Sequence, residues 1–367
     1  MKVLYFVHHL FGKDGWSVNA LNTIEPMVSM GRQCVAIVNE VNPAIPVVQI
    51  AILRKPLRYL RYPFLIFLDL FKILKIIKKE KPDVIHFLVE PYAFFSYFIK
   101  LFFNCKQVLT VCGTYAVLPY NQLRTKLLSI LYYRSIDFII SISGYTASRL
   151  LKILPKLKDK VIVIPAGINW ADLKSAAAAT KQTPQTAISI VFTGQIKERK
   201  GVLEALQALS LYKNTYHSNF IFSIIGQYDR HQKYWQELNA YITANGLTNN
   251  VEFCGLLPES QKNEKLKNAD LFIMLSRVDG DHFEGYGLVY LEANAFGVPV
   301  IGPNDSGTTQ PIKDGYSGYV VTPSDPRQVV EKIDLILNKH SINAQNCLLW
   351  AEAHDRRKIS QQIFALY

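Results

Sequence analysis

Residues 283–301 read Phe-Glu-Gly-Tyr-Gly-Leu-Val-Tyr-Leu-Glu-Ala-Asn-Ala-Phe-Gly-Val-Pro-Val-Ile, a glycine-broken loop that runs into an apolar helix and then into a strand. Gly285 and Gly287 leave backbone amides uncovered beside the first turn of that helix, and such a turn attracts phosphate groups. Glu292 then lies one to two turns inside the helix, while Glu284 stays on the loop. This pattern predicts a phosphorylated ligand, with one glutamate holding a ribose and the other holding a sugar. An ordinary surface helix gives the same spacing and is the alternative.

Strand-like runs alternate with helical patterns along the whole chain. In the first half they cover residues 2–8, 34–38, 83–87, 107–111, 138–142 and 161–164. In the second half they cover residues 189–192, 220–225, 251–254, 271–275, 298–301 and 318–321. This alternation predicts an α/β protein of two Rossmann-like, doubly wound domains with a ligand cleft between them. We expect a first domain over residues 1–170, a linker over 171–187 and a second domain over 188–345.

A basic loop opens the second domain. Lys197, Arg199 and Lys200 gather between the carboxyl end of a strand and an amphipathic helix. Cations in this position suit a diphosphate, whose charge as a leaving group needs neutralisation in the transition state. A solvated basic loop without a ligand is the alternative interpretation.

These motifs, taken in order, resemble retaining nucleotide-sugar glycosyltransferases of family 4. Glu284 and Glu292 match the Glu-x7-Glu signature of that family, and Lys200 matches its phosphate-binding lysine. The resemblance implies the GT-B fold, with a C-terminal helix over residues 346–367 that crosses back to the first domain. Gln195 departs from the pattern, because an arginine is usual at that position.

The resemblance also implies a role for each matching residue. Lys200 and Arg199 would stabilise the departing diphosphate, and Glu284 would orient the donor sugar. The residues implied to bind the donor are Glu292, Gly285, Tyr286, Gly287, Leu288, Gln195 and Gly15. The implied reaction is a front-face displacement in which the leaving phosphate takes the acceptor proton. It requires no metal and no other cofactor.

Two further departures concern the sugar. Cys112 replaces the histidine of the family's His-Gly segment, and Gln310 takes the place of a common glutamate. Cys112, Gly113 and His86 are therefore candidate contacts for the sugar or the acceptor. His86 ends a strand, where a lone histidine more often has a structural role.

The positive charge lies in one half of the chain. Residues 1–170 contain 22 Lys and Arg against nine Asp and Glu, whereas residues 171–367 contain 19 against 20. A basic half-molecule favours anionic partners, and residues 54–81 mix bulky apolar side chains with nine basic ones. We expect this segment to bind an anionic membrane surface; a domain helix packed on the sheet is the alternative. The basic half lacks a nucleic-acid-binding motif, so we expect no nucleic acid partner.

The composition sets the cellular context. The five cysteines are scattered, which predicts reduced thiols, and no run of apolar residues is long enough to span a membrane. We therefore expect a cytoplasmic enzyme, peripheral on the inner face of the cell membrane. It would transfer sugar from a nucleotide diphosphate to a lipid-linked or polysaccharide acceptor in cell-surface glycan biosynthesis. A nucleotide-sugar epimerase and a non-catalytic glycan- or partner-binding subunit are the alternatives.

Overall fold

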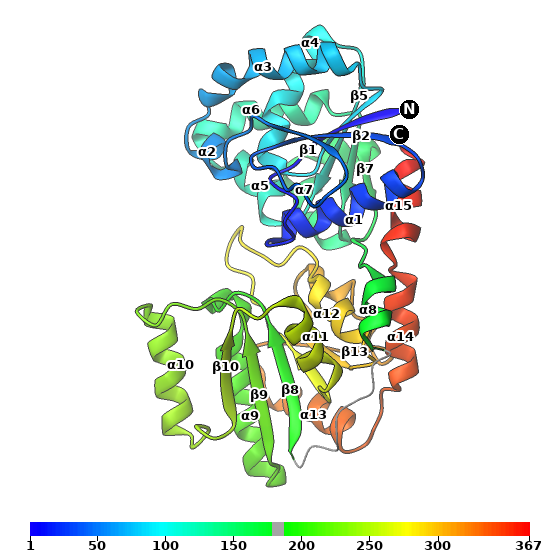
Figure 1. The fold of residues 1–367 in the computed structure, drawn as a ribbon. Helices are drawn as coiled ribbons and strands as arrows, with labels where there is room; N and C mark the ends of the chain where they lie inside the picture. The colour runs from blue at the N-terminus through cyan, green and yellow to red at the C-terminus, as the bar shows by residue number, and fades with distance from the viewer. Residues whose placement is uncertain (178–186) are drawn as a thin grey trace. The chain divides into compact units, whose positions relative to one another are not determined.

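The computed structural model describes residues 1–177 and 187–367 and divides the chain into two compact units. Unit 1 comprises Met1–Gly167 and Arg356–Tyr367, and unit 2 comprises Ile168–Asp355. Each unit is a parallel β-sheet flanked by helices (Figure 1). The prediction of two Rossmann-like domains is therefore confirmed.

The sheet of unit 1 has the strand order β3-β2-β1-β4-β5-β6-β7, and every pair of neighbours is parallel. The strands are β1 (Lys2–Phe6), β2 (Gln33–Val38), β3 (Val48–Ala51), β4 (Val84–Phe87), β5 (Lys106–Val111), β6 (Phe138–Ser141) and β7 (Val161–Val163). The sequence analysis missed only β3, a short, partly exposed edge strand that follows Pro43 and Pro46 and is not separated from β2 by a helix. The strand order reverses between β1 and β4, so loops after these strands lie at the usual ligand-binding edge.

The helices of unit 1 are α1 (Gly15–Ser29), α2 (Pro56–Arg61), α3 (Leu65–Glu80), η1 (Glu90–Phe95), α4 (Ser96–Phe102), α5 (Thr114–Asn121), α6 (Leu123–Ser135), α7 (Gly144–Ile153), η2 (Pro155–Lys160) and α15 (Arg356–Phe364). Helix α1 begins where Asp14 and Ser17 form a reciprocal capping box. The N-cap of helix α7 is Ser143, whose hydroxyl accepts a hydrogen bond from the amide of Thr146. Polar caps therefore fix the start of both helices.

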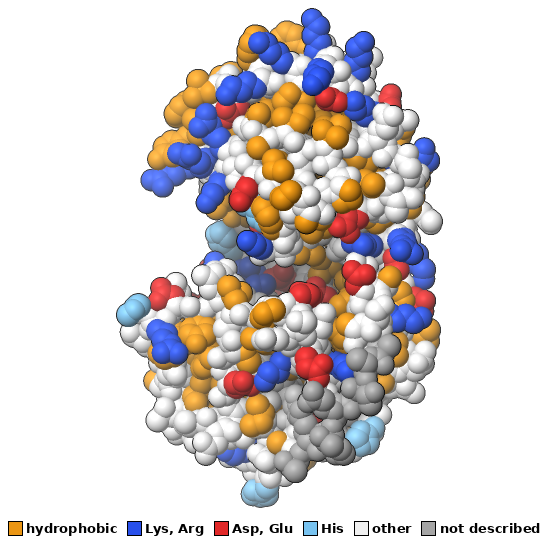
Figure 2. All heavy atoms as spheres, viewed as in Figure 1, with side chains coloured by type: hydrophobic (Ala, Val, Ile, Leu, Met, Phe, Trp, Pro, Cys, Tyr) orange, Lys and Arg blue, Asp and Glu red, His pale blue; other side chains and the backbone are white. Residues whose placement is uncertain are grey.

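Helices α2, α3, α4 and α6 and the turn between α2 and α3 leave large apolar side chains exposed beside lysines and arginines (Figure 2). The apolar residues are Leu57, Tyr62, Phe64, Phe67, Leu68, Phe71, Leu101, Phe102, Leu123 and Leu127, and we refer to them as the apolar face of unit 1. In the described part of the chain, no helix has the length and hydropathy needed to cross a bilayer.

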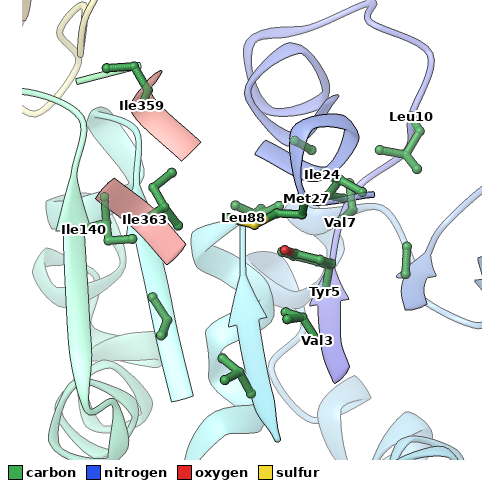
Figure 3. Close-up of a cluster of buried hydrophobic side chains, with 14 of the residues drawn as sticks. Val3, Tyr5, Val7, Leu10, Ile24, Met27, Leu88, Ile140, Ile359 and Ile363 are labelled. Carbon is green, nitrogen blue, oxygen red and sulfur yellow. The ribbon is translucent and has the colours of Figure 1, made fainter. Parts of the chain in front are cut away.

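The core of unit 1 contains residues from far apart in the sequence (Figure 3). Val3 and Tyr5 of β1 pack in the same buried cluster as Ile359 and Ile363 of α15. Helix α15 lies against α1, where the Ser360 hydroxyl donates to the carbonyl of Asn22 at 3.2 Å. The C-terminal segment therefore completes the first unit.

The sheet of unit 2 has the order β10-β9-β8-β11-β12-β13, again with all pairs parallel. Its strands are β8 (Ile188–Thr193), β9 (Phe220–Ile225), β10 (Val251–Gly255), β11 (Leu271–Ile273), β12 (Val300–Pro303) and β13 (Gly318–Val321). All six overlap the runs expected from the sequence. Strands β8 and β11 are neighbours, so the loops that follow them emerge side by side.

The helices of unit 2 are α8 (Trp170–Ala177), η3 (Glu198–Lys200), α9 (Val202–Tyr216), α10 (Lys233–Ala244), α11 (Glu259–Lys267), α12 (Leu288–Asn294), η4 (Gly307–Thr309), α13 (Pro326–Leu337) and α14 (Ala344–Ala353). The expected linker is wrong in its first part, because Trp170 and Leu173 are buried and anchor α8 in unit 2. Residues 178–186 of that linker lie outside the described residues.

The C-terminal segment differs in detail from the expected helix over residues 346–367. Helix α14 packs against α12 and remains in unit 2, and the chain enters unit 1 only at Arg356. Gly167 lies directly against Arg356, because an added Cβ at Gly167 would lie only 2.6 Å from the Cα of Arg356. The backbone segments that enter and leave unit 2 are therefore in direct contact.

Candidate functional site

The glycine loop before α12 has a conformation that its sequence explains. Gly287 has a φ of +90° and serves as the N-cap of α12 without a capping side chain. A Cβ at Gly287 would lie 2.7 Å from the ring of Tyr290, whose hydroxyl donates to the carbonyl of Met274 at 2.6 Å. Both the backbone angle and the packing therefore require glycine.

A second main-chain contact holds this loop in place. The amide of Gly307 in η4 donates to the carbonyl of Glu284 at 2.9 Å. A Cβ at Gly307 would lie only 2.0 Å from the carbonyl oxygen of Gly285. The glycine at position 307 thus allows the two backbones to meet, and this contact holds the loop before α12 against η4.

The basic loop after β8 is fixed in the same way. Gly201 has a φ of +71°, and a Cβ there would lie 1.8 Å from the carbonyl oxygen of Leu275. The carbonyl of Arg199 accepts the amide of Arg277 at 2.8 Å. The side chain of Arg277 also forms an ion pair with Glu204 at 2.6 Å, a contact that the sequence analysis did not find. These contacts hold the basic loop against the segment that follows β11.

The two loops bring together the three predicted catalytic residues. The carboxylate of Glu284 lies 2.5 Å from Nζ of Lys200 and 3.4 Å from Nη1 of Arg199. The side chains of Glu284 and Lys200 are 18% and 17% exposed, so this cluster is shielded but reachable. Burial opposes ionisation of Glu284, but the charges of Lys200 and Arg199 outweigh it and hold its pKa below the usual range. Glu284 is therefore a carboxylate that can accept hydrogen bonds from hydroxyl groups.

Glu292 has a different partner. Its carboxylate accepts a hydrogen bond from Nζ of Lys262 on α11 at 3.0 Å, and Lys262 also contacts Glu259 at 2.9 Å. Burial opposes the charge of Lys262, but the two carboxylates raise its pKa. The sequence analysis missed Lys262, since no local signal distinguishes it from the other lysines of a polar helix.

The remaining donor-binding candidates of unit 2 lie in unlike environments. Gln195 is exposed on the loop after β8, and Leu288 is partly buried at the start of α12. Tyr286 is only 2% exposed, and its hydroxyl has no hydrogen-bond partner among the described residues. Its contribution to a ligand contact is therefore limited to the backbone.

In unit 1, Gly15 is the exposed first residue of α1, next to a compact polar cluster. One carboxylate oxygen of Asp14 lies 3.2 Å from Nδ1 of His8 and 3.1 Å from Nε2 of His9. Burial lowers the pKa of His9. These three side chains are close enough to share a metal ion, although the sequence analysis expected no metal site. The amide of Phe11 lies 3.4 Å from the other nitrogen of His9, which favours the tautomer that donates to Asp14.

Cys112 also belongs to unit 1, where its amide donates to the carboxylate of Glu90 at 2.7 Å. The second oxygen of Glu90 accepts the indole N–H of Trp16 at 2.8 Å. Burial raises the pKa of Glu90 to about 7. Gly113 follows with a φ of +141° and is the N-cap of α5. The sequence analysis missed Glu90, whose position after an apolar strand end was the available signal.

His86 does not fit the role of a ligand contact. Its side chain is fully buried in β4, with Nδ1 against the hydroxyl of Tyr367 at 2.5 Å and Nε2 against the hydroxyl of Thr110 at 2.8 Å. Burial lowers its pKa to about 3, so it stays neutral. Both nitrogens are occupied within unit 1, and the histidine links β4 to β5 and to the C-terminal segment.

Two family models match the chain. The model described as Glycosyltransferase Family 4 matches residues 14–171, and the model described as Glycosyl transferases group 1 matches residues 174–347. The boundary between these matches lies close to the boundary between units 1 and 2. Each model thus corresponds to one unit of the structure.

Curated relatives are similar over about half of the chain. The putative colanic acid biosynthesis glycosyltransferase WcaL of Escherichia coli is 27% identical over 55% of this chain and 48% of the relative. The phosphatidyl-myo-inositol mannosyltransferase of Mycobacterium leprae is 25% identical over 58% of this chain and 54% of the relative. The chain thus spans about half the length of these relatives.

Solved structures share the fold over the whole chain. HepE of Anabaena in complex with UDP has a TM-score of 0.78 at 17% identity, with 100% of this chain and 99% of that chain covered. The lipopolysaccharide outer core galactosyltransferase WaaB has a TM-score of 0.73 at 14% identity, with both chains fully covered. The architecture is the GT-B fold.

Proposed function

Because the chain belongs to glycosyltransferase family 4, we propose that it transfers a sugar from a nucleotide diphosphate donor to a hydroxyl group of a lipid-linked or polysaccharide acceptor. The proposed role is in cell-surface glycan biosynthesis. Support comes from WcaL, which is named for colanic acid biosynthesis, and from the phosphatidyl-myo-inositol mannosyltransferase. HepE has been solved with UDP and with UDP-glucose, which supports a nucleotide-sugar donor.

The cluster of Lys200, Arg199 and Glu284 carries this proposal. Two cations at the carboxyl end of β8 can neutralise the diphosphate as it departs, which is the task that a metal ion performs in other phosphate chemistry. The ionised Glu284 lies beside them and can accept hydrogen bonds from sugar hydroxyls. One small cluster thus offers cations to the phosphates and an acceptor to the sugar.

The other donor contacts follow from the loop geometry. Backbone amides from Gly285 to Leu288 lie at the start of α12, where no side chain caps the helix, and they can donate to phosphate oxygens. Glu292 lies in the next turn and can accept from ribose hydroxyls. We propose retention of the anomeric configuration, with the leaving phosphate as the group that takes the acceptor proton.

The apolar face of unit 1 supports a membrane-bound acceptor. Phe67 and Phe71 are 60% and 64% exposed on α3, in the segment that the sequence analysis assigned to a membrane surface. Lys72 and Lys75 are exposed on the same helix, with Nζ of Lys75 over the ring of Phe71 at 4.4 Å. A lysine near an anionic bilayer contributes about 1 kcal/mol. Exposed apolar residues on α4 and α6 support a wider surface of the same kind. We propose peripheral binding to the cytoplasmic face of the membrane.

A thermal-shift panel of UDP, GDP, ADP, CMP and dTDP sugars tests the donor assignment. A donor that binds the native state raises the melting temperature. Glu292→Gln should lose most of that rise, because the substitution keeps the shape but removes the charge. Glu252→Gln is a matched control, since Glu252 pairs with Lys265 of the same helix α11 at 2.6 Å.

The outcomes separate the alternatives. A rise in melting temperature that depends on Glu292 and accompanies sugar transfer supports the glycosyltransferase. Donor binding that leads to a change in the sugar without transfer supports the epimerase. If no donor raises the melting temperature, the proposal is wrong and a non-catalytic subunit is the better interpretation.

A further inference from the structure

A groove of about 780 Å³ opens on the surface of unit 1, between α2 and the start of α6. It is lined by Leu57, Leu60, Arg61, Gln122, Leu123 and Arg124. Leu57 and Leu123 are 51% and 92% exposed, and both belong to the apolar face of unit 1 defined above. Its surface therefore combines apolar side chains with two permanent positive charges.

The side chain of Arg124 contacts the main chain of Arg61. Nη1 of Arg124 donates to the carbonyl of Arg61 at 3.3 Å, and the guanidinium of Arg61 lies over the ring of Tyr62 at 5.3 Å. Among the residues that the structure describes, neither guanidinium forms an ion pair with a carboxylate. Their donors are therefore available to an external anion.

The neighbouring side chains define the kind of anion. Guanidinium groups form forked hydrogen bonds that match phosphate oxygens. A small soluble anion would contact only the arginines, whereas an amphiphile contacts both the arginines and the exposed leucines. We propose that this groove binds the phosphate headgroup of an anionic membrane lipid, with Leu57 and Leu123 in the acyl boundary.

This inference rests on the membrane association proposed above but assigns it a specific contact. The lysines of α3 attract any anionic surface, and their effect depends on charge alone. Binding in the groove depends on geometry as well as charge, because two planar guanidinium groups would hold one headgroup in a fixed position. The lipid thereby sets the orientation of unit 1 on the bilayer.

Flotation of the full chain with vesicles tests the groove. The vesicles contain phosphatidylcholine with about 30% phosphatidylglycerol, at about 0.15 M salt. The double variant Arg61→Gln/Arg124→Gln should bind roughly 30-fold more weakly than the parent. Lys156→Gln/Lys158→Gln removes the same charge from exposed positions of η2 and should change binding by no more than about twofold.

A variant that conserves the charge distinguishes the forked hydrogen bonds of arginine from the effect of positive charge alone. Arg61→Lys/Arg124→Lys should still bind at least about fivefold more weakly than the parent. Parental binding by this variant, or an equal loss in the Lys156 and Lys158 control, would overturn the headgroup site. Release from the vesicles by inorganic phosphate at about 10 mM would also overturn it, in favour of a free-phosphate site.

The donor thermal shift, measured in parallel, keeps the two proposals distinct. A double arginine variant that binds the donor like the parent shows that unit 2 is intact. If the parent binds the donor but not the vesicles, the groove proposal fails and the transferase proposal stands. If the parent binds vesicles but no donor, the transferase proposal fails.

Discussion

The contact between Gly307 and the loop before α12 permits a quantitative test with Gly307→Ala. The new Cβ would lie 2.0 Å from the carbonyl oxygen of Gly285, whereas real Cβ contacts are almost never shorter than 3.0 Å. The two backbones must therefore separate by about 1 Å. Such a strain costs about 1–3 kcal/mol. The hydrogen bond from Gly307 to Glu284, worth about 1 kcal/mol, weakens as well.

Together these losses amount to about 3 kcal/mol. In a unit of this size, 1 kcal/mol corresponds to about 2–4 °C, so the melting temperature of unit 2 should fall by about 9 °C. Displacement of the loop should also weaken donor binding by at least about tenfold, because donor-binding groups must be held within about 0.5 Å. Differential scanning calorimetry and donor titration measure the two effects.

Gly246→Ala is the matched control. Gly246 lies in the same unit and, unlike Gly307, has a positive φ of +62°, but nothing lies within 4 Å of its added Cβ. The cost is then only the backbone strain of about 1 kcal/mol, and donor binding should not change. Equal effects of the two substitutions on stability and affinity would refute the reasoning, since the close contact between Gly307 and Gly285 would then add nothing to the cost of a substitution that lacks such a contact.

Three other predictions concern charged groups. Burial raises the pKa of Glu284, but the charges of Lys200 and Arg199 outweigh burial and lower it. The ionised Glu284 therefore stabilises the fold above its ordinary pKa, and this stabilisation is lost on acidification. The melting temperature of the parent should fall more steeply than that of Glu284→Gln from about pH 5 to pH 3. Burial raises the pKa of Glu90 from 4.5 to about 7, so the parent should lose stability between these values as the pH rises, and Glu90→Gln should show a flatter profile. Lys200→Gln should lower kcat by about 10²–10³, while Lys197→Gln, at an exposed position of the same loop, should have little effect.

These predictions can each fail in a distinct way. Parallel acid profiles of the parent and Glu284→Gln would mean that the ion pair does not stabilise unit 2. An unchanged slope in Glu90→Gln would mean that another group titrates there. Equal kcat values for the two lysine variants would mean that the charge acts from a distance and not through contact with the diphosphate.

The strands could be predicted from the sequence because most form short apolar runs between polar or glycine-rich turns. Strand β9 was expected at 220–225 and has those bounds in the structure. Strand β3 was missed because its short apolar run follows Pro43 and Pro46 and no helical pattern separates it from β2. Helix α8 was missed because Trp170 and Leu173 are too few to create a periodic pattern.

The candidate site was predictable in part. The motifs identified Lys200 and Glu284 separately, but their contact joins positions 84 residues apart and depends on β8 and β11 being neighbours. Lys262 became recognisable only when α11 and Glu292 were placed together. Pairing of this kind is a property of the sheet order, which one sequence does not reveal.

The position of α15 has a consequence for the order in which the chain folds during synthesis. Unit 2 is a continuous segment and can form its core as soon as residues 168–355 have been made. Unit 1 begins earlier, but it lacks Ile359 and Ile363 until translation has passed through all of unit 2. On the ribosome, unit 1 is therefore synthesised first but completed last. Part of its core stays uncovered until α15 has been made.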